Sequence, residues 1–432
     1  MAKVQFISTN RKTAIGGAQF FISYWEKIGM SGLINKQLGK YSRIKTKFSY
    51  NDLLLSLSLL FLSGGEVLED VQQLREEGFS LNNDFRISSP DTLARKMKAL
   101  SVQSKKASSQ HNTFKFNHNA KLNRLLLKTA LQCGGISKST SHTLDYDNTL
   151  IFTEKSDAKM TYKQSLGYCP GVATIGDQIV YIEQRDGNMP VTFRQKNTLE
   201  RVLNELDNHG VRISNLRVDC GSYTKEILSY LFEKEHIKTY VRAQNNEYEI
   251  ERIWRTAKWK KILMKGRKLE CCSVPFQGLE LQEKELKLII YREQKKDHKK
   301  AGRLFDRDNY KVFTILTNDK EKSEKEVIEF YNKRGSSELN FRDLKGDYSW
   351  KKLPFSDINH NHTFLILTAL VRNVITAFTR KASEKIRGLK PTSRLKRLRH
   401  KIITIPGEWV MKKGEWILRL FSSNKEIRKL AV

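Results

Sequence analysis

The chain has 432 residues, with 78 lysines and arginines against 47 aspartates and glutamates, which gives a net charge of +31. Hydrophobic residues make up 39% of the chain, enough to bury a large core, so a fully disordered protein is excluded. So large a positive excess favours a polyanion as the partner. At roughly 100–200 residues per domain, the length predicts two to four domains.

Three further features narrow the class of protein. The two most apolar stretches, 53–62 and 364–378, fall short of the ~18 uninterrupted apolar residues that cross a bilayer, so we expect buried helices and no membrane contact. The start of the chain lacks the apolar stretch of a signal peptide, which predicts a cytoplasmic protein. The 5 cysteines include no C-x-x-C pair, so neither a disulfide framework nor a thiolate zinc site is expected.

Residues 1–136 are predicted to be mostly helical, because apolar residues recur at helical spacing in 18–28 and 50–63. A further helix should begin at Ser89 or Asp91, with Pro90 in its first turn. Short helices that include a basic one suit a region that binds DNA ends, and a plain helical bundle is the alternative. The basic side chains expected on the exposed face of that helix are Arg95, Lys96 and Lys98.

Residues 103–119, rich in Ser, Lys, His and Asn, are interpreted as an exposed linker. From 137 to 243 the pattern alternates between strands and helices, which predicts a mixed α/β layer. The expected strands are 143–152, 172–175, 178–183, 213–219 and 237–243, and the expected helices are 196–208 and 223–235.

Residues 244–318 interrupt this alternation and read as a mostly β insertion with charged loops at 258–267 and 294–307. The α/β layer resumes over 319–385, with a helix from about 322 to 345 and an apolar helix from about 361 to 385. A basic region, 386–432, expected to be helical, ends the chain. From Arg380 onward, 16 basic residues stand against 4 acidic ones.

Carboxylates stand at the ends of two predicted strands. Asp145 and Asp147 are two residues apart and therefore share one face of their strand. Asp219 ends the apolar run 213–219, and ligands of open α/β sheets bind at such strand ends. Hard divalent cations prefer carboxylate oxygens, and two such ions can drive phosphodiester chemistry. Taken singly, each of these aspartates is as compatible with a turn or a helix cap.

The helix expected over 322–345 carries an unusual polar stripe. At about 100° per residue, four of its residues fall within roughly 60° of one face. A core helix would place Leu or Val there, whereas phosphates and metals are bound by charged groups. A solvated face with an Arg334–Glu338 pair is the alternative. The four residues are Tyr331, Arg334, Glu338 and Lys345.

The spacing Tyr-x2-Arg-x3-Glu-x6-Lys resembles the signature of DDE transposases of the insertion-sequence-four superfamily, and the surrounding sequence is most similar to the thirteen-eighty branch. The resemblance covers about residues 85–410. The supporting motifs are Asp145-Tyr-Asp-Asn-Thr149, Gly167-Tyr-Cys-Pro170, Arg217-Val-Asp-Cys-Gly221 and Ser89-Pro-Asp-Thr-Leu-Ala-Arg95.

The resemblance implies a ribonuclease-H-like mixed sheet flanked by helices, with two Mg²⁺ ions, replaceable by Mn²⁺, held by Asp147, Asp219 and Glu338. Asp145 remains a rival to Asp147 as the first ligand. An aromatic residue of the insertion would stack on an extruded base; packing within the inserted sheet is the alternative. The residues that would contact DNA are Tyr331, Arg334, Lys345, Arg342, Trp254 and Trp259.

The implied activity is cleavage of the inverted-repeat ends of an insertion sequence and joining of their 3′ ends to target DNA, by a homodimer when two ends are paired. A host nuclease on the same core and a DNA-binding protein without catalysis are the alternatives. Retention of all three acids with the whole polar stripe favours the active enzyme. We therefore expect a bacterial cytoplasmic protein that joins the nucleoid when bound to DNA.

Overall fold

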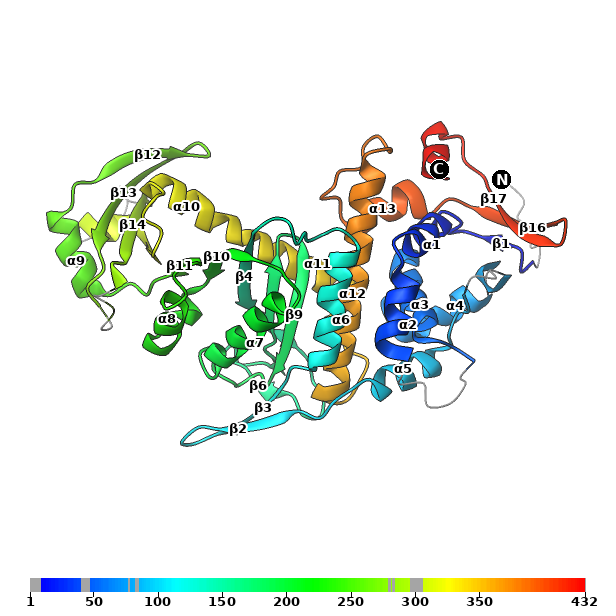
Figure 1. The fold of residues 1–432 in the computed structure, drawn as a ribbon, viewed down its shortest axis with the longest axis horizontal. Coiled ribbons are helices and arrows are strands. Elements are labelled where there is room, and N and C mark those ends of the chain that lie inside the picture. Colours follow the sequence, from blue (N-terminus) through cyan, green and yellow to red (C-terminus); the bar gives the residue numbers. More distant parts are fainter. Residues whose placement is uncertain are drawn as a thin grey trace, which may run out of the picture.

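A computed structural model describes residues 9–39, 47–76, 78–81, 85–278, 281, 284–295 and 306–431. One mixed sheet of eleven strands runs through the molecule (Figure 1), in the order β12-β13-β14-β15-β11-β10-β4-β8-β9-β3-β2. Its strands are β2 (Lys105–Ser108), β3 (Thr113–Asn117), β4 (His142–Asn148), β8 (Gly171–Ile175), β9 (Gln178–Arg185), β10 (Ile213–Val218), β11 (Lys238–Arg242), β12 (Lys260–Met264), β13 (Arg267–Pro275), β14 (Lys287–Gln294) and β15 (Tyr310–Thr317).

The centre of the sheet carries the α/β layer expected from the sequence. Strand β4 pairs antiparallel with β8, which pairs antiparallel with β9, while β10 is parallel to both β4 and β11. The resulting order β9-β8-β4-β10-β11 is compatible with a ribonuclease-H-like core. Helices α7 (Gln195–Asp207) and α8 (Lys225–Phe232) pack their apolar side chains against Leu144, Tyr146 and Leu216 of β4 and β10. Because side chains alternate along a strand, Asp145 and Asp147 face the opposite side.

Helix α12 (Ile358–Ser383) is the centre of the largest core. It is long and apolar enough to cross a membrane, but 94% of its most apolar window is buried inside the protein. It lies beside α6 (Ala120–Gln132), and the pair separates the sheet from the N-terminal helices (Figure 1). The expectation of a buried helix is thus confirmed.

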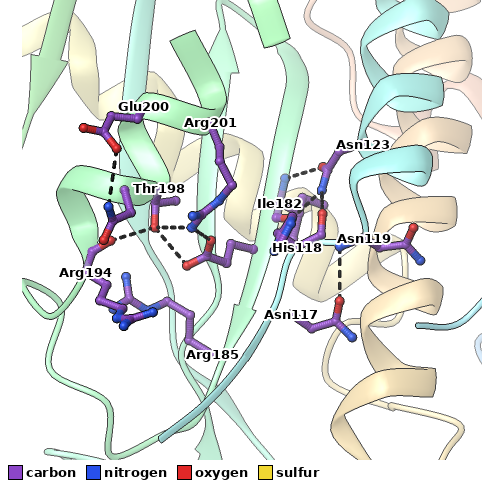
Figure 2. A network of polar contacts seen from close by, with 12 residues as sticks. Asn117, His118, Asn119, Asn123, Ile182, Arg185, Arg194, Thr198, Glu200 and Arg201 are labelled. Carbon is purple, nitrogen blue, oxygen red and sulfur yellow. Dashed lines mark hydrogen bonds and ion pairs between the residues drawn. The ribbon is translucent and has the colours of Figure 1, made fainter. Parts of the chain in front are cut away.

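Two asparagines join these helices to β9, over a stretch of this strand that β3 does not pair with. Asn373 of α12 accepts a hydrogen bond from the Ile179 amide at 3.0 Å and donates to the Ile179 carbonyl at 2.8 Å. Asn123 of α6 does the same for Ile182, at 2.8 and 2.9 Å (Figure 2). Each side-chain amide therefore replaces a strand neighbour, which satisfies backbone groups that would otherwise be buried without partners.

The N-terminal region is largely helical, as the sequence predicts. Ser89 caps α5 by accepting from the Thr92 amide at 3.3 Å, and Pro90 is its first residue. Lys96, expected on the surface, is buried with its ammonium group 4.4 Å from the centre of the Tyr50 ring. The helices are α1 (Ala18–Lys27), α2 (Met30–Leu38), α3 (Tyr50–Ser63), α4 (Val71–Glu76) and α5 (Pro90–Ala99).

The insertion extends the main sheet, because β15 pairs antiparallel with β11. Helix α9 (Glu247–Thr256) covers one face of its strands and α10 (Glu324–Asn332) the other. The charged loop expected over 258–267 is wrong, since this stretch contains β12 and the turn into β13. Lys265 and Gly266 have φ of 47° and 77°, as a two-residue hairpin turn requires. The lysines of β12 are tolerated because it is an edge strand.

Two further expectations about irregular or helical segments are wrong. The linker expected over 103–119 contains the hairpin β2–β3, because Ala107, Phe114 and Phe116 form a small core with Met189. The C-terminal region 386–432 is not simply helical. It holds a short helix, α13 (Leu395–Leu398), and a second hairpin, β16 (Gly407–Lys412) and β17 (Glu415–Leu420), on which β1 (Lys12–Thr13) pairs. The two ends of the chain therefore form one small sheet.

The single helix expected over 322–345 is divided. Helix α10 ends at Asn332, a 3₁₀ turn covers Lys333–Gly335, and α11 (Ser336–Asp347) follows. Gly335 is a poor helix former, which weakens the helix at this point. A 3₁₀ turn advances about 120° per residue instead of about 100°, so three such residues rotate the following helix by about 60° relative to the first. Strands β5 (Ile151–Phe152), β6 (Lys159–Met160) and β7 (Leu166–Tyr168) form the remaining small sheet.

Candidate active site

Asp147 and Asp219 come together at the ends of two neighbouring strands. Strands β4 and β10 pair in parallel up to Tyr146 and Val218, so the next residue on each strand is one of the two aspartates. Burial, opposed by Arg334 and assisted by the negative charge of Asp219, raises the pKa of Asp147 to about 6. Burial also raises the pKa of Asp219. The site thus concentrates two partly desolvated negative charges in a strongly basic protein.

Arg334 provides the positive charge nearest to this pair. Its Nη1 atom lies 2.8 Å from Oδ2 of Asp147, and the two side chains are 17% and 13% exposed. Burial alone would lower the pKa of Arg334, but Tyr331, Asp147 and Asp219 together raise it. The guanidinium therefore offsets part of the negative charge that Asp147 and Asp219 bring together.

Tyr331 is buried and does not face solvent. Its hydroxyl donates to the Val218 carbonyl at 3.2 Å, directly before Asp219, and burial raises its pKa to about 12. In this structure the phenol therefore fixes α10 to β10, and any contact with DNA would require this hydrogen bond to be released.

Asp145 is engaged by a different arginine. Both of its carboxylate oxygens accept from Arg217, which donates through Nε and Nη2 at 2.7 Å each. Burial raises the pKa of Asp145, an effect that the bond to Arg217 opposes. A third nitrogen of Arg217, Nη1, donates to the Phe330 carbonyl at 2.6 Å. Asp145 thus shares the strand face of Asp147 but has both oxygens committed inside the protein.

Lys345 and Arg342 lie on the same helix in different surroundings. Lys345 is half-buried, and its pKa is lowered first by burial and then by Lys351, while Cys169 and Asp147 act in the opposite sense. Lys345 is therefore within electrostatic reach of Asp147. Arg342 is 53% exposed, and its Nη2 atom lies 3.6 Å from Oδ1 of Asp343.

Glu338 lies exposed in the first turn of α11. Within the described ranges, the structure holds no group of three or more His, Cys, Asp or Glu side chains placed to bind a metal ion. Two of the three expected ligands therefore lie together, and the third is not seated beside them. The rotation introduced by the turn at Lys333–Gly335 gives a physical reason for this, because the expected alignment assumed one continuous helix.

The two tryptophans of the insertion belong to an aromatic cluster. Their ring centres are 5.4 Å apart, and Trp254 also contacts Tyr310 at 5.4 Å. The guanidinium of Arg292 lies 4.0 Å from the ring centre of Trp254 and 3.9 Å from that of Trp259. Arg292 also forms an ion pair with Glu270 at 2.7 Å. Each ring thus has an internal packing partner, although both side chains are only partly buried and neither lies on a strand of the sheet.

Sequence reasoning gave no role to Arg217, although it lies in one of the quoted motifs. The available signal was its position two residues before Asp219 on the same strand, which turns both side chains to one face. An arginine on a buried strand requires an acidic partner, and Asp145 was the nearest candidate on the adjoining strand.

The mixed sheet and the two aspartates beside an arginine are compatible with a DNA-processing enzyme of the transposase class. The family model described as "Transposase DDE domain group 1" matches residues 10–430, so the chain belongs to this family of DDE transposases. No curated protein matches the chain. Membership implies metal-dependent nuclease or transposase activity with DNA as the substrate, and such enzymes typically use divalent metals.

Proposed function

We propose that this protein is a cut-and-paste transposase of the insertion-sequence-four superfamily, in its thirteen-eighty branch. It binds the inverted-repeat ends of its element, cleaves them and joins the 3′ ends to target DNA. The observation that carries the proposal is the pairing of Asp147 with Asp219 at adjacent strand ends, with Arg334 bound to one of them. This arrangement joins a cation site to a phosphate-binding group in a chain of net charge +31.

The residues present fit a divalent metal. Asp147 and Asp219 offer oxygen ligands whose buried charges a cation would stabilise, as their raised pKa values indicate. Glu338 would complete the set from the first turn of α11. When bound, Mg²⁺ or Mn²⁺ would activate the attacking oxygen and stabilise the leaving one. A ligand group of two buried and one exposed carboxylate supports a site that is completed as the metal and the DNA bind.

The protein's own cations would position the substrate. Arg334 can exchange its bond to Asp147 for a phosphate oxygen, because a guanidinium binds both anions with the same forked geometry. Lys345 lies within reach of the same carboxylate and would add a second phosphate contact. The scissile phosphate would then be placed between these cations and the two aspartates, where an in-line displacement needs it.

The test is the Asp219→Asn variant in two assays with the DNA that flanks the gene. Gel-shift binding to the element's ends should stay near the wild-type level, while strand cleavage with Mg²⁺ or Mn²⁺ should be lost. A variant that cuts at the wild-type rate would overturn the assignment of Asp219. Joining of the released 3′ ends to a plasmid distinguishes a transposase from a host nuclease, which would cut without strand transfer.

Pairing of two DNA ends in one complex requires at least two protomers at that stage, so we propose a homodimer in the synaptic complex. The working location would be the bacterial cytoplasm, with the protein on the nucleoid when bound to DNA. Sedimentation of the protein with and without end DNA tests the first of these points, because a dimer should form in the presence of paired ends.

A further inference from the structure

The ion pair between Asp145 and Arg217 lies directly beside the candidate metal ligands, and the chemistry proposed above does not use it. The side chains are 1% and 7% exposed. One guanidinium makes three contacts, two at 2.7 Å to the carboxylate on β4 and one at 2.6 Å to the Phe330 carbonyl on α10. Because Arg217 itself belongs to β10, a single side chain joins both aspartate-bearing strands to the helix that precedes Arg334.

The last turn of α10 is held on β10 at two consecutive residues. Arg217 bonds the Phe330 carbonyl and lies 5.0 Å from the centre of the Phe330 ring. Tyr331 donates to the carbonyl of Val218, the next residue of the strand. Arg334 follows one helical turn later and reaches Asp147. The position of Arg334, and of α11 behind it, is therefore set by contacts that begin at Arg217.

We propose that Asp145 and Arg217 are positioning residues for DNA cleavage. They hold the end of α10 against β10, so that Arg334 is presented to Asp147 and α11, which carries Glu338, starts from a fixed point. This inference rests on the proposed function and extends it to two residues that would touch neither the metal nor the phosphodiester. Asp145 in this role is distinct from a metal ligand, since a metal that took its oxygens would leave a buried guanidinium without its partner.

The Arg217→Lys variant tests the role of the guanidinium. Lysine keeps the charge but has one nitrogen, which cannot reach both Asp145 oxygens and the Phe330 carbonyl together. We expect kcat for cleavage to fall about 100-fold, because small displacements of catalytic groups have effects of that size. KM for the end DNA and Mn²⁺ affinity, the latter measured by electron paramagnetic resonance without DNA, should both stay within about threefold of wild type.

A second ion pair with a buried carboxylate supplies the control. Glu183, 1% exposed, pairs with Arg201 and accepts from Thr198 at 2.9 Å. Figure 2 shows Thr198 and Arg201 on α7, which packs on the face of the sheet opposite Asp145. Glu183→Gln should therefore lower the unfolding temperature as a buried-pair variant does, but leave kcat within about threefold of wild type.

The Asp145→Asn variant separates positioning from ligation and also serves if Arg217→Lys does not fold. A positioning role predicts reduced kcat with Mn²⁺ affinity near wild type, whereas a ligand role predicts the same loss of affinity that is expected for Asp147→Asn. The inference is overturned if Asp145→Asn loses Mn²⁺ as Asp147→Asn does, if both Arg217→Lys and Asp145→Asn keep wild-type kcat, or if Glu183→Gln loses kcat equally. A wild-type protein that cuts no DNA would overturn the proposed function as well, whereas a cutting wild type isolates the failure to this inference.

Discussion

The two halves of the candidate site are held in different ways. Asp147 and Asp219 are fixed by the parallel pairing of β4 and β10, and burial raises the pKa of both. Glu338 is exposed on a helix that begins after a 3₁₀ turn. Backbone pairing alone thus brings the carboxylates of Asp147 and Asp219 together, whereas the position of the Glu338 carboxylate depends on how α11 is oriented. The strand half is a pair of carboxylates that already lie together. Glu338, the helix half, would join them when substrate and metal bind.

The largest expected effect comes from the exposed half. We expect Glu338→Gln to reduce DNA cleavage by about 10³-fold or more, because loss of a metal-binding carboxylate removes several kcal/mol of transition-state stabilisation. The unfolding temperature should not change, since the side chain is exposed and forms no hydrogen bond or ion pair within the described part of the chain. Cleavage rates and thermal unfolding measured on one preparation check both parts.

An equal rate for Glu338→Gln and wild type would show that the site works with the two strand carboxylates alone. The exposed residue Glu329 on α10 is a suitable control, because Glu329→Gln removes a charge from the preceding helix without touching the proposed ligand set.

Arg334 connects the two halves, and its removal should affect both. In Arg334→Gln, cleavage should fall by about 10²-fold, as for loss of a positioned phosphate donor. The metal-free protein should also lose stability, by less than the ~3–5 kcal/mol typical of a fully buried pair, because these side chains are 17% and 13% exposed. Unfolding with and without Mn²⁺ measures this, and the metal should restore part of the loss.

For Arg334→Gln, the matched control is Arg342→Gln, which removes a 53% exposed guanidinium from the neighbouring helix. Its stability should stay within about 0.5 kcal/mol of wild type, as for surface substitutions generally. If the two variants lose equal stability, the bond between Arg334 and Asp147 does not stabilise the metal-free site.

The strand half was largely predictable from the sequence, and the helix half was not. Alternation along β4 places Asp145 and Asp147 on one face, and an apolar run ending in Asp219 indicates a strand end. Both inferences need only local geometry. The ion pair of Asp145 could not be predicted in this way, because the three hydrogen bonds of Arg217 join three elements distant in sequence.

The helix half depended on a local departure from regular geometry. The polar stripe was calculated for one regular helix, with a constant angle per residue. The 3₁₀ turn at Lys333–Gly335 breaks that assumption, so the calculated direction of Glu338 no longer holds. Strands within polar stretches were also missed, because only a few of their side chains are apolar. The hairpin at 105–117 rests on a few buried side chains, such as Phe114 and Phe116, within a polar stretch, and composition alone favours a loop there.

The pH dependence of stability, measured without metal, tests how burial affects the ionisation of Asp147. The pKa of Asp147 rises from 3.8 to about 6 on folding, so the protonated carboxyl favours the folded state. Its contribution to stability is complete below about pH 4 and is lost as the pH rises through 6. Relative to wild type, Asp147→Asn should therefore gain on the order of 1–3 kcal/mol of stability between pH 4 and pH 7.

Denaturant unfolding of both proteins across this pH range, in the presence of a chelator, measures that difference. The same protonation competes with metal binding, so Mn²⁺ affinity of wild type should fall as the pH drops below about 6. A stability difference that does not vary with pH would show that Arg334 offsets the burial of Asp147 completely.

The smallest expected effect separates two cations on α11. Lys345 is half-buried within electrostatic reach of Asp147, whereas Arg342 is 53% exposed beside Asp343. If DNA is held at the strand half, Lys345→Ala should weaken end binding several-fold and reduce the slope of log K against log salt by about one, because one phosphate contact is lost. Arg342→Ala should change both quantities less, since Asp343 already offsets its charge. Fluorescence anisotropy at several salt concentrations measures each slope, and equal slopes for the two variants would mean that the DNA runs along the exposed face of α11 instead of over the paired aspartates.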